Sequence, residues 1–197
     1  MTNRSTQSVR ADALRALHHG SRPLVLGNAW DAASARVLAK AGFPAVATTS
    51  GGVAEALGYG DHEQAPADAM FAAAGRIALA VELPVTADLE AGYGLAPEDL
   101  ARRAVEAGVA GLNLEDSDYR AGGLVDSAQQ AARIAGVKAA ARRLGVDRVL
   151  NARIDVFVPR AGAPESWLAE ATRRGLACRD AGADCVYPIL LDDASSR

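Results

Sequence analysis

The sequence predicts an α/β protein of the (β/α)₈ TIM-barrel type, a single domain over residues 1–197 that holds about six of the eight βα units. Three observations lead to this prediction. Short apolar runs alternate with Ala-rich segments of helical length. The runs are apolar throughout rather than at every second position, which is typical of parallel strands buried on both faces. A short phrase also repeats, and this favours a barrel of βα units over a doubly wound sheet.

The repeated phrase marks the ends of helices. Ala41-Gly42, Ala107-Gly108 and Ala181-Gly182 each close an Ala-rich segment, and an apolar run begins within a few residues of each. Glycine adopts the left-handed conformation that commonly follows a helix without steric strain. Each phrase therefore predicts the end of a helix, a short loop and the start of a strand.

The elements follow in order from this pattern. We expect strands, each a short apolar run, at residues 24–28, 45–49, 84–88, 111–115, 149–153 and 185–189. We expect helices, each an Ala-rich stretch between two runs, at residues 32–41, 67–81, 97–107, 127–144 and 164–181. The start of the third helix is well marked, because Pro97 suits a first turn and Glu98 and Asp99 lie at its positive end.

The number of strands limits how complete the barrel is. A closed barrel of this type needs eight strands and typically about 250 residues. Here six strand-like runs are found, and only residues 190–197 of the given sequence follow the sixth. We therefore expect either that the chain lacks the C-terminal quarter of the barrel or that it forms an open sheet of fewer strands.

The composition and the net charge of the chain limit the kinds of molecule that we expect it to bind. The formal net charge is −3 and no run of basic residues occurs, so we expect neither nucleic acid nor a membrane as a partner. The N-terminus is polar, and no apolar stretch approaches the roughly 20 residues of a spanning helix, so we expect a cytoplasmic protein. Cys178 and Cys185 fall in a helix-like and a strand-like run, which predicts two reduced core thiols.

Carboxylates recur where the predicted strands end. Asp88 and Glu90 end one apolar run and precede a flexible Gly92-Tyr93-Gly94 turn, and Glu115-Asp116 ends the next run. A buried charge must be paired or bound to a metal, so such acids are poor packing residues. They are good ligands for a hard divalent cation, which prefers carboxylate oxygens.

Other polar residues follow the strands at the same predicted edge, where parallel α/β folds place their active sites. They are Asn28, Asp31, Thr48, Thr49, Ser50, Arg153 and Asp155. Several carboxylates at one edge repel each other unless a cation lies among them, and a divalent metal explains them economically. The alternative is that some are helix caps, which applies most to Asp31 and Asp116.

Two loops could complete this site. Residues 48–52 form a small-residue loop whose backbone N–H groups could hold a carboxylate, a phosphate or an enolate oxygen. In the long loop over 53–64, Asp61 could reach over the site as a further acid, whereas His62 is more consistent with a solvated side chain. The polar loop over 116–127 resembles a mobile cover.

Arg153 is an unusual residue for the end of a strand. Its planar guanidinium suits the bidentate capture of a substrate carboxylate. The alternative is a structural ion pair with Glu115 or Asp155. His18 and His19, in the N-terminal helical region, are expected at the surface.

Together these residues resemble the isocitrate lyase and phosphoenolpyruvate mutase superfamily, and most closely its small phosphonomutase-like members. The matching stretches span nearly all of the chain. They are Gly27-Asn28-Ala29-Trp30-Asp31, Thr49-Ser50-Gly51-Gly52, Asp88-Leu89-Glu90-Ala91-Gly92-Tyr93-Gly94, Leu114-Glu115-Asp116 and Ala152-Arg153-Ile154-Asp155. The acidic-x-acidic-x-Gly-Tyr-Gly segment is the most specific of them.

The resemblance implies a barrel completed by exchange of a C-terminal helix, a homo-oligomer (dimer or tetramer), bound Mg²⁺ or Mn²⁺, and a small 2-oxo or 2-hydroxy acid as substrate. It implies that Asp88 binds the metal directly, with Asp61, Glu90 and Glu115 holding it largely through water. The roles it implies are catalytic for Asp61, Glu115 and Arg153, substrate-binding for Ser50, Gly51, Gly52, Asp88 and Arg153, and metal-binding for Asp88, Glu90 and Glu115.

The sequence departs from two branches of this superfamily. The lyase branch carries Lys-x-Cys-Gly-His on the loop after the fourth strand, where this chain has Tyr119-Arg120-Ala121-Gly122-Gly123 and no cysteine. The mutase pattern has Lys and Asn on this loop and a His after the sixth strand. This chain has neither between residues 116 and 127, and Tyr187-Pro188-Ile189 lacks the histidine. A standard isocitrate lyase and a true mutase are both disfavoured.

The leading hypothesis is a Mg²⁺-dependent enzyme that acts on a small 2-oxo or 2-hydroxy diacid through an enolate-type intermediate. The reaction is that of a lyase, a hydrolase or a phosphonomutase-like enzyme, with C–C cleavage favoured over P–C chemistry. The rival hypothesis is a non-catalytic or truncated remnant that acts as an assembly piece. A class II aldolase of similar chemistry is a third possibility.

Overall fold

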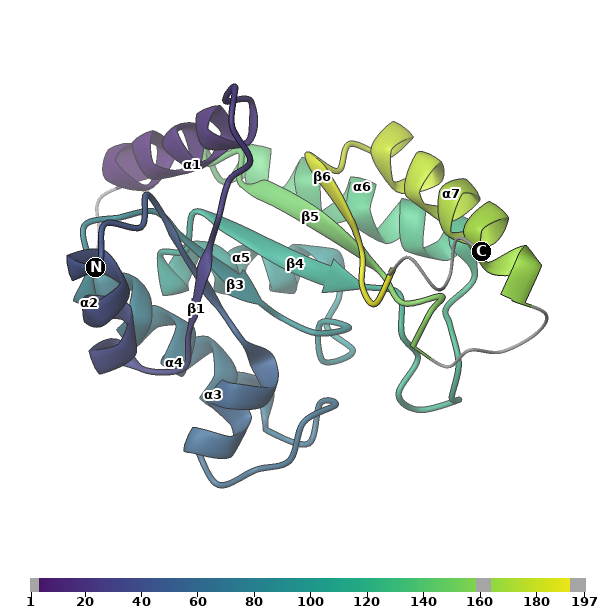
Figure 1. Ribbon diagram of the computed structural model, residues 1–197, viewed down its shortest axis with the longest axis horizontal. Coiled ribbons are helices and arrows are strands. Elements are labelled where there is room, and N and C mark those ends of the chain that lie inside the picture. The colour runs from purple at the N-terminus through teal and green to yellow at the C-terminus, as the bar shows by residue number, and fades with distance from the viewer. Residues whose placement is uncertain (1–3, 159–163, 192–197) are drawn as a thin grey trace.

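Figure 1 shows a computed structural model of the protein, which describes residues 4–158 and 164–191. Its strands are β1 (Gly27–Ala29), β2 (Val46–Thr48), β3 (Val85–Asp88), β4 (Gly111–Glu115), β5 (Val149–Ile154) and β6 (Cys185–Pro188). Its helices are α1 (Arg4–His18), α2 (Ala32–Lys40), α3 (Ser50–Ala56), α4 (Ala67–Ala80), α5 (Pro97–Ala107), α6 (Ser127–Arg143) and α7 (Pro164–Asp180).

The six strands form one parallel sheet in the order β1-β2-β3-β4-β5-β6. Each strand is followed by at least one helix before its neighbour begins, as the repeated phrase predicts. Within the described residues the sheet stays open, with β1 and β6 at its two edges, rather than closing into a barrel. The expectation of six βα units is therefore confirmed.

The predicted bounds agree with the structure to within three residues. β4 and α5 begin and end at the predicted residues. α5 has Pro97 in its first turn and ends at Gly108, which adopts the left-handed conformation with φ of 75°. The predictions for these two elements are correct because they depend on local properties of the chain: the periodicity, a proline at the start of the helix and a glycine after its end.

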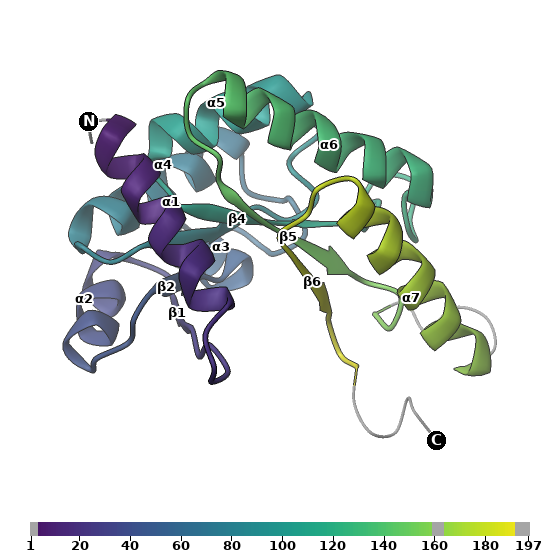
Figure 2. The ribbon, with the colours of Figure 1, turned by 90° about the horizontal axis from the view of Figure 1, so that it is seen from above.

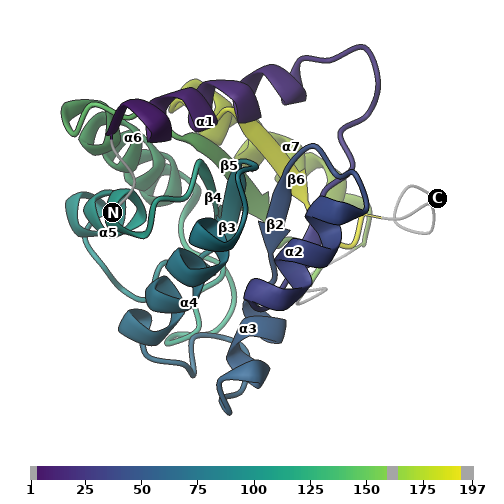
Figure 3. The same cartoon turned by 90° about the vertical axis from the view of Figure 1, so that its left-hand side faces the viewer.

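The helices cover the outer face of the sheet in sequence order. α2, α4 and α5 lie side by side in Figure 3, and α6 and α7 continue the layer. α1 instead crosses the end of the sheet where the strands begin (Figure 2). Its Arg15 donates to the backbone oxygen of Asp147 just before β5, over 2.7 Å. At the opposite end of the sheet, where the strands finish, lie the loops that connect each strand to the next helix.

The core lies between the sheet and these helices. Leu112, Leu114, Leu150 and Ile154 are fully buried strand residues. The facing helices present many alanines, which let helix and strand backbones approach closely. Burial of both faces explains why the strands read as continuous apolar runs.

The segment over residues 48–52 differs from the prediction. We expected a loop, but Ser50–Ala56 forms α3 directly after β2. Two glycines weaken a helix by roughly 1 kcal/mol each. Here the Thr49 hydroxyl caps the helix by accepting from the Gly52 N–H, and a Cβ on Gly52 would lie 2.7 Å from Cγ2 of Thr49. Gly52 therefore makes room for the cap, and a loop was the wrong prediction.

A buried lysine ties α6 to the start of the last two strands. Lys138 is 3% exposed, and its Nζ lies 2.8 Å from Oδ2 of Asp184 and 2.7 Å from Oδ1 of Asp147. It also donates to the backbone oxygen of Arg148 over 2.8 Å. A buried ammonium is tolerated because it donates two hydrogen bonds and pairs with two carboxylates.

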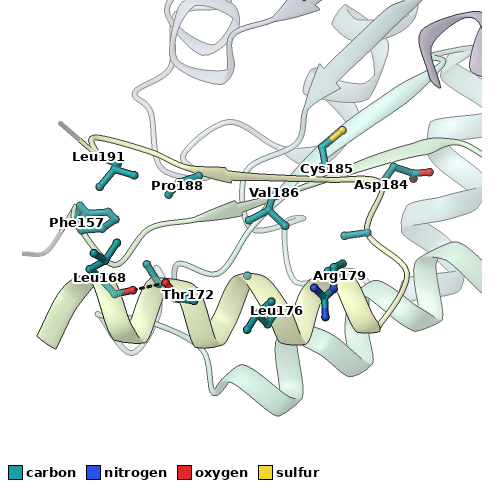
Figure 4. Close-up of a pocket in the computed structure, with 13 residues that line it drawn as sticks. Phe157, Leu168, Thr172, Leu176, Arg179, Asp184, Cys185, Val186, Pro188 and Leu191 are labelled. Atoms are coloured by element: carbon teal, nitrogen blue, oxygen red, sulfur yellow. Dashed lines mark hydrogen bonds between the residues drawn. The ribbon is translucent and has the colours of Figure 1, made fainter. Parts of the chain in front are cut away.

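The β6 edge of the sheet carries an apolar cavity of about 360 Å³ between β6 and α7. Val186 points from the strand toward the helix, where Leu168 and Leu176 line the other wall (Figure 4). Cys178 is buried, Cys185 is half-buried, and both are free thiols, as predicted. Among the described helices, each is too short or too polar to cross a membrane.

Candidate functional site

Adjacent strands bring three predicted site residues to the same end of the sheet. Asp88 is the last residue of β3, and Glu115 is the last residue of β4. Glu115 pairs in register with Arg153 of β5. Because the strands are parallel, their final residues meet at one edge. The sequence-based placement of these residues is thus reproduced by the fold.

Asp88 is oriented by hydrogen bonds from the first residue of α3, which follows the neighbouring strand β2. The backbone N–H and the hydroxyl of Ser50 both donate to Oδ2 of Asp88, over 3.2 and 2.9 Å. The Asp88 N–H donates to the hydroxyl oxygen of Thr48 over 2.8 Å. Oδ1 of Asp88 is buried and has no hydrogen-bond partner. Ser50 therefore fixes one carboxylate oxygen and leaves the other available.

Glu115 and Arg153 form a buried ion pair. Nη1 of Arg153 lies 2.7 Å from Oε2 of Glu115, which is 1% exposed. Burial raises the pKa of Glu115 to about 8, with Arg153 acting in the opposite direction. Nε and Nη2 of Arg153 donate to the two carboxylate oxygens of Asp155, over 2.7 and 2.9 Å. The alternative role considered for Arg153, an ion pair with Glu115 or Asp155, is what the structure contains.

Glu90 is held by two residues that the sequence analysis did not assign to the site. The Glu63 N–H donates to Oε2 of Glu90 over 2.5 Å, and the Tyr93 hydroxyl donates to Oε1 over 2.9 Å. The Glu63 carboxylate in turn accepts a short hydrogen bond from the Tyr93 N–H. Burial raises the pKa of Glu90, and the charges of Asp61 and Asp88 add to the shift. We call Glu63, Glu90 and Tyr93 the clasp.

The clasp joins two loops whose backbones are strained. His62, Glu63, Glu90 and Tyr93 adopt φ values of 66°, 57°, 50° and 58°, in the left-handed region that side chains rarely occupy. Only one other non-glycine residue of the described chain, Leu190, does so. Such strain persists where surrounding contacts over-determine the backbone, and it gathers at functional sites. In the sequence, the position of Tyr93 between two glycines was the signal that could have indicated this strained segment.

Asp61 lies against the start of α3. It is exposed, and a Cβ added to Gly51 would come within 2.9 Å of its Oδ2. Glycine at this position thus lets the Asp61 carboxylate approach the backbone beside Ser50. Gly52 makes a different contact, since its N–H is directed to the Thr49 cap. The expectation that Gly52 belongs to a substrate cradle gains no support from this geometry.

The loop after β4 contacts the site through Tyr119. The Tyr119 hydroxyl donates a short hydrogen bond to Oε1 of Glu115. The His62 ring lies 5.1 Å from the Tyr119 ring, tilted by 30°, so the two loops touch above the carboxylates. Sequence analysis described this loop as a cover but did not identify Tyr119 as a site residue.

Two of the candidate acids have structural roles. Asp31 caps α2, accepting from the Ser34 N–H over 2.7 Å within a capping box. Asp116 is buried and pairs with Arg174 of α7 over 3.0 Å, while also accepting from the Asp155 N–H. The cap expected as an alternative is therefore correct for Asp31, and Asp116 is an ion-pair partner instead.

The donor set fits a hard cation held largely through water. No three His, Cys, Asp or Glu side chains of the described chain converge closely enough to bind an ion directly. Mg²⁺, however, usually keeps several waters and takes one or two carboxylates. Oδ1 of Asp88 offers one buried, unpartnered oxygen. Beyond burial, Asp88 also raises the pKa values of Glu90 and Glu115, so negative charge is in excess here.

Comparison with known proteins shows which family this chain resembles. A family model, phosphoenolpyruvate phosphomutase, matches residues 14–196. The crystal structure of a proposed phosphonomutase from Burkholderia cenocepacia J2315 has a TM-score of 0.86 at 46% identity, covering 94% of this chain and 77% of that chain. The structure of oxaloacetate acetylhydrolase in complex with the product oxalate has a TM-score of 0.83 at 30% identity, covering 96% and 66%.

A curated relative gives the same result. The 2,3-dimethylmalate lyase of Eubacterium barkeri is 32% identical over 185 residues, which cover 90% of this chain and 62% of that protein. The chain spans 62–65% of the length of the first curated relatives that it matches. The family match nevertheless extends over almost every described residue. The chain therefore belongs to the phosphoenolpyruvate phosphomutase family of the PEP mutase/isocitrate lyase superfamily, as its sequence motifs predict.

Proposed function

We propose that this protein is a Mg²⁺-dependent enzyme that acts on a small 2-oxo or 2-hydroxy diacid through an enolate-type intermediate. We favour cleavage of a C–C bond over P–C chemistry. The observation that carries the proposal is the buried, unpartnered Oδ1 of Asp88 at the end of the sheet where Glu115 and Arg153 also lie. Relatives named for dimethylmalate and oxaloacetate support the class of substrate.

Asp88 would hold the metal directly, and Asp61, Glu90 and Glu115 would hold it through water. When bound, Mg²⁺ supplies positive charge that stabilises the developing enolate oxygen. Mn²⁺, which accepts the same oxygen ligands, would serve in its place. The hydrogen bonds of Ser50 and of the clasp keep Asp88 and Glu90 oriented before any ligand arrives. Preorganised groups of this kind need no rearrangement as the reaction proceeds.

Arg153 would pair with a substrate carboxylate. A guanidinium has five N–H donors. Two of these donate to Asp155 and one nitrogen faces Glu115, so N–H groups of Nη1 and Nη2 remain for a ligand. Ser50 and the Gly51 backbone would lie beside the same ligand, next to Asp61.

Glu115 and Tyr119 are the groups suited to holding a proton beside the substrate. Their side-chain oxygens share a short hydrogen bond. Burial raises the pKa of Glu115 to about 8, so this carboxyl can bind and release a proton near neutral pH. A proton shared between these two groups lies next to Arg153, where a substrate carboxylate would bind. This pair takes the place of the cysteine that the lyase branch carries on the same loop.

The test combines metal binding with turnover. We expect Mg²⁺ titration calorimetry of the intact chain to show a defined site, and a panel of 2-oxo and 2-hydroxy diacids to include a substrate. Asp88→Ala should abolish both. The matched control is Asp99→Ala, an exposed acid of α5 that pairs with Arg102. Equal turnover by the wild type and Asp88→Ala would remove the metal site from the mechanism.

A non-catalytic remnant is the second candidate, and the contacts of Arg153 with two acids of its own chain favour it. A remnant should bind no Mg²⁺ and turn over no acid, whereas an enzyme should do both. The homo-oligomer implied by the resemblance, a dimer or a tetramer in the cytoplasm, also remains our proposal. Light scattering of the purified chain measures its size.

A further inference from the structure

A second cavity, of about 290 Å³, lies beside the proposed active site. It is bounded by the loop after β3, the loop after β4 and the first half of α6. Arg120, Arg133 and Gln129 line it. Glu63, a member of the clasp, and Tyr119 form its wall on the side of the proposed active site. Glu63 and Tyr119 therefore contact both this cavity and the carboxylates of the site.

Both guanidiniums in this cavity lack an ion-pair partner. Arg153 and Arg174, by contrast, pair with Asp155 and Asp116. In the described residues no carboxylate oxygen lies within 4.0 Å of the guanidinium of Arg120 or Arg133. Arg133 lines the cavity, and none of its nitrogens is both buried and without a partner. Burial of Arg133 lowers the pKa of its guanidinium, which an anion beside it would reverse.

The glycines of Gly92-Tyr93-Gly94 bring these two arginines together. A Cβ on Gly92 would lie 2.5 Å from Nη2 of Arg133, and a Cβ on Gly94 would lie 2.6 Å from Nη2 of Arg120. Both glycines also have positive φ, of 80° and 67°. The motif thus lets a guanidinium from α6 and another from the loop after β4 lie against one short segment.

Two acids, Glu63 and Asp118, also line the cavity, but their hydrogen bonds come from backbone N–H groups and not from the two guanidiniums. The Glu63 carboxylate accepts from the Tyr93 N–H, although its charge is felt at Arg133. Asp118 accepts from the backbone N–H groups of Arg120 and Ala121, over 3.0 and 2.9 Å, and these bonds together with the charge of Arg120 lower its pKa. The guanidinium N–H groups therefore remain available to a ligand. Arginine pairs bind carboxylates through strong, charge-assisted hydrogen bonds.

We propose that this two-arginine cavity is a second binding site, separate from Asp88, that takes a small dicarboxylate. The choice of a carboxylate over another oxyanion such as phosphate rests on the proposed function, because the cavity shares Glu63 and Tyr119 with the site that would process diacids. A diacid held there would contact the clasp and the loop after β4 on the side that faces away from Asp88. The site therefore serves as a place where substrate or a related acid binds before or beside the reacting molecule.

Calorimetry with succinate and, separately, with inorganic phosphate tests this proposal, using the full chain without metal. We expect succinate to bind the wild type, and Arg120→Gln and Arg133→Gln each to bind it about tenfold to hundredfold more weakly, as expected for loss of a charge-assisted hydrogen bond. Arg143→Gln is the matched control, because Arg143 lies on the exposed side of the same helix. It should bind like the wild type.

The Asp88→Ala variant separates this proposal from the proposed function. Succinate binding that persists in Asp88→Ala, and is weakened there by Arg120→Gln, supports a second site even if no turnover is ever found. Succinate binding that is lost in Asp88→Ala, or unchanged by both arginine variants, overturns the proposal. Absence of binding to the wild type does so too, and binding of phosphate alone overturns the choice of a dicarboxylate. Arg120 is exposed, so its variant should fold even if Arg133→Gln does not.

Discussion

Glu63 and Glu90 are joined across two loops by a 2.5 Å hydrogen bond from the backbone N–H of Glu63 to Oε2 of Glu90. The contact places a loop that follows α3 onto the loop that follows β3. Both residues have positive φ, so neither loop adopts this shape by local preference. The contact therefore determines where Asp61, two residues before Glu63, lies relative to Asp88.

Removal of the Tyr93 hydroxyl should weaken the clasp. In Tyr93→Phe, Oε1 of the buried Glu90 loses its donor, so we expect the free energy of unfolding to fall by roughly 1–3 kcal/mol. Urea denaturation measures this change. Tyr59→Phe is the control, because Tyr59 is 43% exposed and should lose almost nothing. Equal stability of Tyr93→Phe and the wild type would show that the hydroxyl does not hold Glu90.

A methyl group on Gly51 should displace Asp61 with little effect on stability. In Gly51→Ala the new Cβ would come within 2.9 Å of a flexible carboxylate, which can move away. We expect weaker Mg²⁺ binding by calorimetry and a melting temperature close to that of the wild type. Gly75→Ala is the matched control: its Cβ meets Ala107 at an ordinary 3.6 Å, and alanine should stabilise α4 by about 0.5–1 kcal/mol. Unchanged metal affinity in Gly51→Ala would contradict this role for Asp61.

The stability of the metal-free protein should depend on pH through Glu115. Its pKa is raised from 4.5 to about 8 in the folded state, so between these values the folded state holds a proton that the unfolded state has lost. Its contribution to stability therefore falls as pH rises through this window, by up to about 1.4 kcal/mol per pH unit. Urea denaturation at several pH values should show a shallower fall for Glu115→Gln. Parallel curves for the two proteins would contradict the shift.

Lys138 should be essential to the packing of α6. In Lys138→Met the side chain keeps its length but leaves the Asp184 carboxylate without its main buried partner, so we expect a loss of roughly 3–5 kcal/mol. Lys40→Met, at an exposed position at the end of α2, is the control and should lose less than about 0.5 kcal/mol. Thermal denaturation of the three proteins compares them. Similar melting temperatures would mean that the remaining partners of Asp184 and Asp147, among them Arg15 and Arg142, satisfy both carboxylates.

Local patterns in the chain predict most of the secondary structure and the general position of the site. Gly108 stops α5 and Pro97 starts it, and both properties depend on a few neighbouring residues. The carboxylates Asp88 and Glu115 could be placed together because parallel strands present their final residues at one edge. No long-range contact was needed for these predictions.

The partners of these side chains follow from packing instead. Arg153 could bind a substrate or its own chain, and the register of β4 with β5 selects Glu115. Ser50 and Asp88 lie 38 positions apart, Glu63 and Glu90 lie 27 apart, and Lys138 and Asp184 lie 46 apart. A hydrogen bond depends on the distance and angle between its atoms. When folding brings two distant segments together, their separation along the sequence gives no information about this distance or angle. The same reason explains why α3, capped by Thr49 and anchored on Asp88, was mistaken for a loop.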